Sequence, residues 1–89
     1  MDEIRTGFVG ILVENRDSVQ EVNRLLSVYA DLIRGRIGIP DRENGNAVIG
    51  LVVEGTNDQM GAMTGKLGNL RGITVKSAMM AKSKDKKET

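Results

Sequence analysis

Two stretches of the chain are apolar at nearly every position, and each is short enough to form a β-strand. Residues 8–13 read Phe-Val-Gly-Ile-Leu-Val, and residues 47–54 read Ala-Val-Ile-Gly-Leu-Val-Val-Glu. Successive side chains point to opposite faces of a strand, so a continuous apolar run places apolar groups on both faces. This pattern is typical of central strands, and it predicts that residues 4–14 and 47–54 form the middle of a sheet.

Two helices are predicted from apolar residues that recur every three or four positions. Ser18 and Glu21 fit a capping box that would begin the first helix, and residues 56–59 carry the signal that begins the second. The apolar stripe of the first helix is expected to consist of Val19, Val22, Leu26, Tyr29 and Ile33, and that of the second of Met60, Met63, Leu67 and Leu70. Because each helix has one stripe, each is expected to cover one face of a sheet.

The second helix also carries a stripe of glycines, Gly61, Gly65 and Gly68, on the side away from its apolar stripe. Glycines inside a helix weaken it. The stripe therefore indicates either a weak helix or a smooth groove that another backbone or a ligand approaches closely, and both interpretations stay open.

Residues 33–40 and 73–79 are predicted to be the edge strands. The first alternates, with Ile33, Ile37 and Ile39 on one face and Arg34, Arg36 and Gly38 on the other. Asn44-Gly45 is a hairpin signal that would return the chain into residues 47–54. Lys76 marks the last strand as an edge.

The order strand, helix, strand, hairpin, strand, helix, strand predicts an α+β fold of the ferredoxin-like βαββαβ type. In this fold two helices lie on one face of a four-stranded antiparallel sheet. The other face is expected to carry Val9, Ile11, Val13, Val48 and Val52, which are costly to leave in water. We predict that this face, or an edge of the sheet, packs on another copy of the chain, first as a C2 dimer and second as a dimer of dimers.

The 89 residues are expected to form one domain, residues 1–81, followed by a disordered charged tail, residues 82–89. The chain has neither Cys nor His, which removes disulfides and the commonest zinc ligands, so we expect no metal and no cofactor. Asp2 and Glu3 argue against a signal peptide. No apolar stretch approaches the ~20 residues that span a bilayer. A cytoplasmic protein without membrane contact is expected.

Catalysis is not expected from these residues. A phosphatase of this fold would need an Arg in the first strand–helix loop, but Glu14 and Asp17 flank Arg16 and would repel a phosphate. Direct binding of nucleic acid is not expected either, because Lys+Arg 13 nearly balance Asp+Glu 12 and the central strands offer only Phe8 for base stacking. Weak nucleic-acid binding through the arginines of residues 34–42 stays an alternative.

A small-molecule-sensing or assembly module is the class that remains. The loop of Glu14, Asn15 and Arg16 offers an acceptor, an amide and a cation within three residues. Such a trio could clamp a zwitterion or a carboxylate. The alternative is that these residues merely end a strand and begin a helix.

Four blocks of the chain, residues 10–16, 35–40, 64–69 and 75–77, read GILVENR, GRIGIP, TGKLGN and VKS. In this order they resemble a family of short bacterial proteins, the iron-only hydrogenase system regulators, over residues 4–80. The resemblance implies an ACT-like fold, similar to the C-terminal regulatory domain of the nickel-responsive repressor, and assembly as dimers and tetramers. It also implies a regulatory role near hydrogenase maturation or redox metabolism.

The nickel-responsive domain binds its metal through His and Cys, which are absent here, so no nickel site is expected. Nothing before Ile4 resembles a DNA-binding segment, so any control of transcription is expected to act through a protein partner. The candidate ligand-binding residues in the matching blocks are Glu14, Asn15, Arg16, Arg36, Gly38, Gly65, Lys66 and Asn69. The predicted function is a homo-oligomeric regulator that senses a small-molecule effector. The alternative is a structural or adaptor protein that acts through protein contacts.

Overall fold

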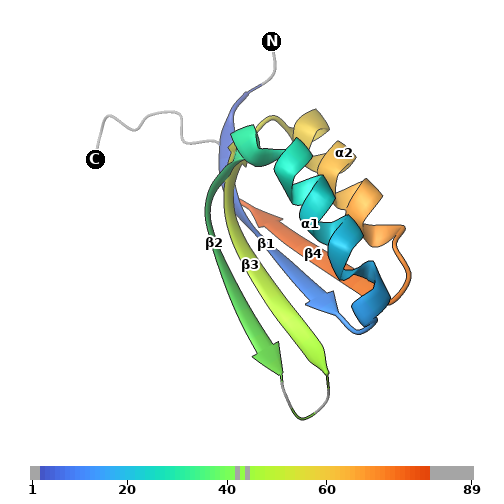
Figure 1. Cartoon of the computed structure of the whole chain (residues 1–89). Helices are drawn as coiled ribbons and strands as arrows, with labels where there is room; N and C mark the ends of the chain where they lie inside the picture. The colour runs from blue at the N-terminus through green and yellow to red at the C-terminus, as the bar shows by residue number, and fades with distance from the viewer. Residues whose placement is uncertain (1–2, 42, 44, 81–89) are drawn as a thin grey trace.

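The computed structural model describes residues 3–41, 43 and 45–80, so the predicted tail at 82–89 lies outside the described residues. The elements are β1 (Arg5–Val13), α1 (Val19–Val28), β2 (Ile33–Asp41), β3 (Asn46–Gly55), α2 (Asn57–Gly68) and β4 (Ile73–Met79), with short 3-10 turns η1 (Arg16–Ser18) and η2 (Ala30–Leu32). The strands form a four-stranded antiparallel sheet in the order β2-β3-β1-β4. Both helices lie on one face of it (Figure 1). The predicted ferredoxin-like fold is confirmed.

The core lies between the helices and the facing side of the sheet. Val9, Ile11 and Val13 of β1 are each at most 3% exposed. The other buried apolar residues are Val22, Leu25, Leu26, Leu32, Ile49, Leu51, Val53, Met60, Met63, Leu67 and Ile73. The prediction that Val9, Ile11 and Val13 lie on the helix-free face is therefore wrong. When a strand is apolar on both faces, its sequence does not indicate which of the two sets of alternating side chains points toward the helices.

The helix-free side of the sheet, the open face, carries Phe8, Leu12, Ile37, Ile39, Val48 and Val52. Cross-strand pairing places Phe8 opposite Val52 and Leu12 opposite Val48. Val48 and Val52 are on this face as predicted. The apolar side chains that β1 adds to it are Phe8 and Leu12.

Strand β2 does not keep one register along its length. A bulge between Ile33 and Gly35 shifts its pairing with β3. Because a bulge reverses which face the following residues occupy, Ile33 packs against the core while Ile37 pairs with Gly50 on the open face. The predicted grouping of Ile33 with Ile37 and Ile39 on one face is wrong.

The two helices begin differently. At α2 the Thr56 side chain accepts from the Gln59 backbone N–H at 3.1 Å and Gln59 Oε1 accepts from the Thr56 N–H at 2.8 Å, which is the predicted capping box. The capping box predicted at Ser18 is wrong. Ser18 already has helical backbone angles, and its Oγ donates to the Arg71 carbonyl at 2.7 Å. The chain turns earlier, at Asn15, whose Oδ1 accepts from the Asp17 N–H at 2.9 Å.

Helix α1 is shorter than its predicted stripe. It ends at Val28, so Tyr29 and Ile33 lie beyond it, and its buried residues are Val22, Leu25 and Leu26. On α2, Met60, Met63 and Leu67 are buried as predicted. No helix in the described part of the chain is long and apolar enough to cross a membrane.

Candidate functional site

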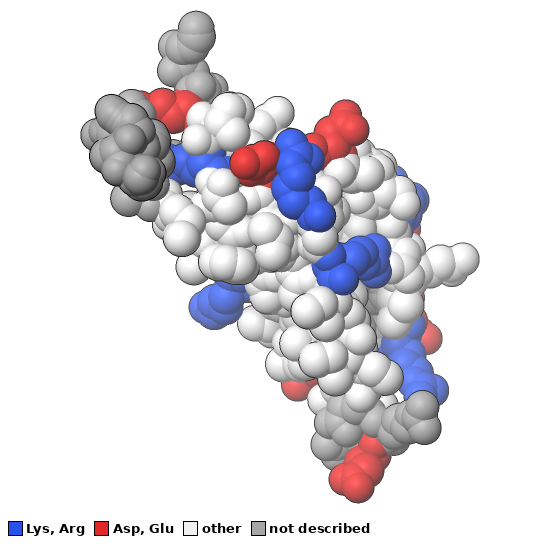
Figure 2. Space-filling model, turned by 90° about the vertical axis from the view of Figure 1, so that its left-hand side faces the viewer, with Lys and Arg blue, Asp and Glu red and all other residues white. Residues whose placement is uncertain are grey.

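The open face is an apolar surface that the fold leaves uncovered. The exposed fractions of its side chains are 51% for Phe8, 66% for Ile37, 59% for Ile39, 45% for Val48 and 38% for Val52. Figure 2, which views the molecule from the left-hand side of Figure 1, shows broad uncharged areas between separate groups of Lys, Arg, Asp and Glu. Isolated exposed apolar residues are ordinary, but a contiguous group of this kind marks a site of contact.

Glycines form the floor of the open face. Gly10 of β1 is opposite Gly50 of β3, and with Gly35 of β2 they line a shallow hollow of about 610 Å³. Phe8, Ile37 and Val52 stand around this hollow. A Cβ atom added to Gly35 or Gly50 would meet no described atom within 4 Å. The open face is therefore both apolar and indented, which favours a contact with a protruding apolar group.

Charged groups lie on this face toward its margins and have both signs. Lys76 of β4 is opposite Gly10 and is exposed. Glu54, at the end of β3, accepts from Arg34 Nε at 3.0 Å and from Thr6 Oγ1 at 3.4 Å. Among the described residues that line the hollow, the one charged residue is Arg36, whose side chain extends toward Asn23 of α1.

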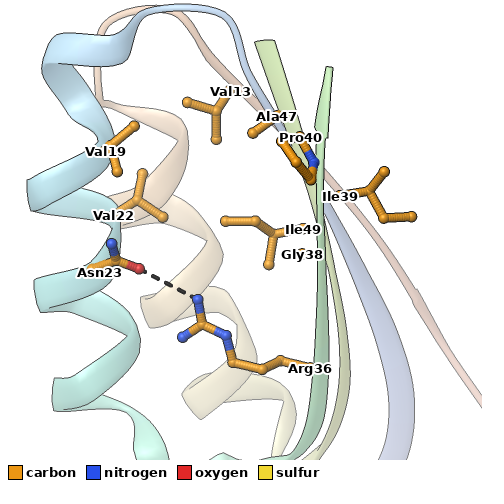
Figure 3. A pocket seen from close by; sticks show the side chains of 10 residues that line it. All are labelled: Val13, Val19, Val22, Asn23, Arg36, Gly38, Ile39, Pro40, Ala47 and Ile49. Carbon is orange, nitrogen blue, oxygen red and sulfur yellow. Dashed lines mark hydrogen bonds between the residues drawn. The ribbon is translucent and has the colours of Figure 1, made fainter. Parts of the chain in front are cut away.

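A second hollow, the hairpin pocket, lies on the helix side between α1 and the β2–β3 hairpin and has a volume of about 250 Å³ (Figure 3). It is lined by Val13, Val19, Val22, Asn23, Arg36, Gly38, Ile39, Pro40, Ala47 and Ile49. Figure 3 shows the Ile39 side chain pointing away from α1, whereas Val22 and Ile49 lie on opposite sides of the space. The walls are mainly aliphatic.

The polar end of the hairpin pocket is formed by two side chains. Arg36 extends from β2 toward α1, and its Nη2 donates to Asn23 Oδ1 at 3.3 Å (Figure 3). No described carboxylate forms an ion pair with Arg36, whereas Arg34 pairs with Glu54 and Arg24 with Glu21. A guanidinium has five N–H donors, so Arg36 can still bind an anion.

The eight candidate residues are spread over three places. Arg36 and Gly38 line the hairpin pocket. The Glu14 N–H donates to the Gly72 carbonyl at 2.8 Å, and Asn15 packs closely against Gly72. Arg16 lies near Gly45 in the hairpin turn, and a Cβ atom added to Gly45 would be 3.9 Å from Arg16 Nε.

The remaining three candidates are on or next to α2. Gly65 is exposed, and a Cβ atom added to it would have no described atom within 4 Å. Lys66 Nζ lies 5.6 Å from the centre of the Tyr29 ring, and the Asn69 N–H at the helix end donates to the Gly65 carbonyl at 3.2 Å. The fold thus does not gather the eight into one cavity.

Sequence reasoning missed Asn23 and the aliphatic wall of the pocket. The signal available was weak, because Asn23 is a polar residue next to the stripe residue Val22. Among the described residues there is no group of three acidic side chains that could hold a metal ion. The arrangement suits an organic molecule with an apolar part and a negative group.

Two of the matches to known proteins bear on the family of the chain. The profile of a family described as "Iron-only hydrogenase system regulator, putative", TM1266-like, matches residues 5–77. The structure of the uncharacterized protein TM1266 from Thermotoga maritima is 36% identical, covers 89% of this chain and 100% of its own, and superposes with a TM-score of 0.85.

Two other structures are similar in fold alone. The C-terminal domain of the MgtC protein from Mycobacterium tuberculosis is 11% identical over 90% of this chain and 92% of its own, with a TM-score of 0.69. A "putative PII-like signaling protein" from Thermus thermophilus is 14% identical over 91% of this chain and 94% of its own, with a TM-score of 0.56. Among curated proteins, none matches the chain.

Proposed function

The chain belongs to the TM1266-like family of iron-only hydrogenase system regulators, and from this premise we propose that it is a homo-oligomeric regulatory domain that senses a small-molecule effector. Two copies associate through their open faces, and the effector binds on the helix side. Control of its target then acts through a protein partner of the oligomer.

The apolar open face is the observation that carries this proposal. Phe8, Ile37 and Val52 surround a floor of glycine backbone, and a small domain has little stability to spare for apolar groups in water. Nothing in the described part of the chain covers these residues. A partner with a matching apolar surface would bury them.

The area of the open face suits a second copy. With nine residues in β1, a rise of about 3.3 Å per residue and a strand spacing of about 4.8 Å give a face of roughly 30 by 19 Å. Two such faces together bury on the order of 1,150 Å², near the ~1,200 Å² lower end of specific interfaces. An interface of this area is at the small end of those that hold specific complexes.

The shape of the face also suits a twofold contact. In a C2 interface the same patch meets itself, so a protruding side chain of one copy must meet a recess of the other. The open face offers both, since Phe8 and Ile37 stand beside the hollow over Gly10 and Gly50. Lys76 and Glu54 give it charges of both signs, so two copies need not repel each other.

Sedimentation of a matched pair of variants tests the proposal. Ile37, 66% exposed, is on the open face, and Val28, 61% exposed, is on α1. We expect wild type to be dimeric or larger, and Ile37→Ser to weaken association by at least about tenfold, because the partner would bury a large apolar side chain that is otherwise exposed. Val28→Ser should associate like wild type. A wild-type monomer at submillimolar concentration, or equal behaviour of the two variants, would contradict the proposal.

A further inference from the structure

We infer that the hairpin pocket binds a small monocarboxylate with an apolar body, whose carboxylate pairs with Arg36. This inference rests on the proposed function, because it names the chemical class of the effector. It adds a position for that effector on the helix side of the sheet, away from the open face.

The size of the pocket limits the ligand. Its volume is about 250 Å³, just below the ~300–1,000 Å³ of most small-molecule pockets. A body of about eight to ten non-hydrogen atoms would fill it, such as a single aromatic ring or a branched aliphatic chain that ends in a carboxylate. Nucleotides and peptides are too large to fit inside.

The lining indicates one polar group at one end of the ligand. Of the residues that line the pocket, only Asn23 and Arg36 have polar side chains, and the others are aliphatic or glycine. Val13, Val22 and Ile49 are at most 9% exposed, so the wall rests on the rigid core. An apolar ligand body would therefore contact preformed walls.

The Arg36 side chain supplies the anion-binding group. Asn23 Oδ1 accepts from one Nη2, which holds the planar guanidinium across the end of the pocket and leaves its remaining N–H donors for a carboxylate. The described pocket lining contains no acidic side chain that would compete. A neutral amide of the same shape would lose the charge-assisted bonds and should bind more weakly.

Glycine at position 38 makes the inference testable without disturbing the fold. Gly38 lines the pocket, and a Cβ added there would meet no described atom within 4 Å. Valine favours strands and would occupy the pocket instead of clashing with its walls. Gly38→Val should therefore fold and fill the site.

The experiment is calorimetric titration of the full chain with benzoate, 3-phenylpropionate and 4-methylpentanoate, and with the matching primary amides. We expect at least one carboxylate to bind and its amide to bind at least about tenfold more weakly, a factor that the loss of one charged contact readily gives. Arg36→Met and Gly38→Val should abolish or weaken binding by a similar factor. Arg36→Lys should retain part of the binding, because lysine keeps the positive charge but lacks the two parallel N–H donors of the guanidinium.

Arg24→Met is the matched control. It removes a positive charge next to Asn23 on α1, but Arg24 pairs with Glu21 in solvent and does not line the pocket. It should bind like wild type. Equal binding of acid and amide, equal effects of Arg36→Met and Arg24→Met, or no binding by any of the three acids would overturn the inference. Sedimentation of the same samples separates the two claims, because a dimer that binds no carboxylate leaves the proposed assembly intact.

Discussion

The two faces of the sheet are made of the same kinds of residue but have different surroundings. Val53 and Val52 are neighbours in β3, yet Val53 is 0% exposed under the helices and Val52 is 38% exposed on the open face. The helix side is filled by side chains of α1 and α2, whereas the open face has glycines at its centre. The comparison teaches that apolar character alone does not define the core, and the second apolar face is the basis of the self-association that we propose.

The largest expected effect comes from changing this pair of valines separately. Val53→Ala should lower the free energy of unfolding by about 2–3 kcal/mol, because it removes buried groups and leaves a cavity. Val52→Ala should cost under about 1 kcal/mol when measured on dilute protein, since the site is already partly wet. Urea unfolding at low concentration measures both. Equal losses at the two positions would show that the faces do not differ as described.

Filling the hollow of the open face should weaken self-association. A Cβ at Gly50 meets no described atom within 4 Å, so Gly50→Val should fold well, and valine suits a strand. The new side chain would occupy the recess into which we propose that the partner inserts, so we expect association to fall by at least about tenfold, or ~1.4 kcal/mol. Gly38→Val, on the helix side of the neighbouring strand, is the control and should sediment like wild type. Unchanged association of Gly50→Val would count against the open face as the interface.

Glycines on the outer side of α2 should behave differently from those of the sheet. Gly61 and Gly65 are exposed, and an added Cβ meets no described atom within 4 Å at either position. Gly61→Ala and Gly65→Ala should each stabilise the protein by about 0.5–1 kcal/mol, because alanine is the better helix former. Thermal unfolding measures this effect, and sedimentation should not change. A loss of association would instead favour the groove interpretation of the α2 glycines.

The smallest effect is expected on the outer surface of α1, which belongs to neither face. A hydrogen bond from Arg24 lowers the pKa of the exposed Glu21 carboxyl below its ordinary value of 4.5. The stability that this pair contributes is therefore present above pH 4.5 and is lost as the pH falls through the lowered folded pKa. Glu21→Gln should slightly flatten the pH dependence of the melting temperature in this acidic range. A steeper dependence of the melting temperature on pH in Glu21→Gln would contradict the lowered pKa of Glu21.

The fold could be predicted from sequence because each local pattern agreed with the same topology. The two continuous apolar runs became the central strands β1 and β3, and Thr56 with Gln59 formed the cap that begins α2. Which side chains of β1 point toward the helices could not be predicted, because both faces of the strand are apolar. In the structure Val9 is opposite Leu51 on the helix side, and Phe8 is opposite Val52 on the open face.

The site was less predictable than the fold. Arg36 and Gly38 were among the candidates, but the pocket they line also needs Asn23 and aliphatic residues from α1 and β3. The bulge between Ile33 and Gly35 decides that Arg36 faces the helices, and no residue pattern in the sequence indicates it. The ligand-binding roles of the eight candidates stay predictions.

Phe8 allows the central claim to be tested directly, because it is the only phenylalanine of the chain, and Tyr29 is the only tyrosine. Fluorophenylalanine places one fluorine label on the open face, and fluorotyrosine places one near the end of α1. Fluorine NMR across a dilution series should show the Phe8 signal shift and broaden with concentration while the Tyr29 signal keeps its position. A Phe8 signal that stays sharp and fixed up to submillimolar concentration would contradict the account, because the open face would then remain in water.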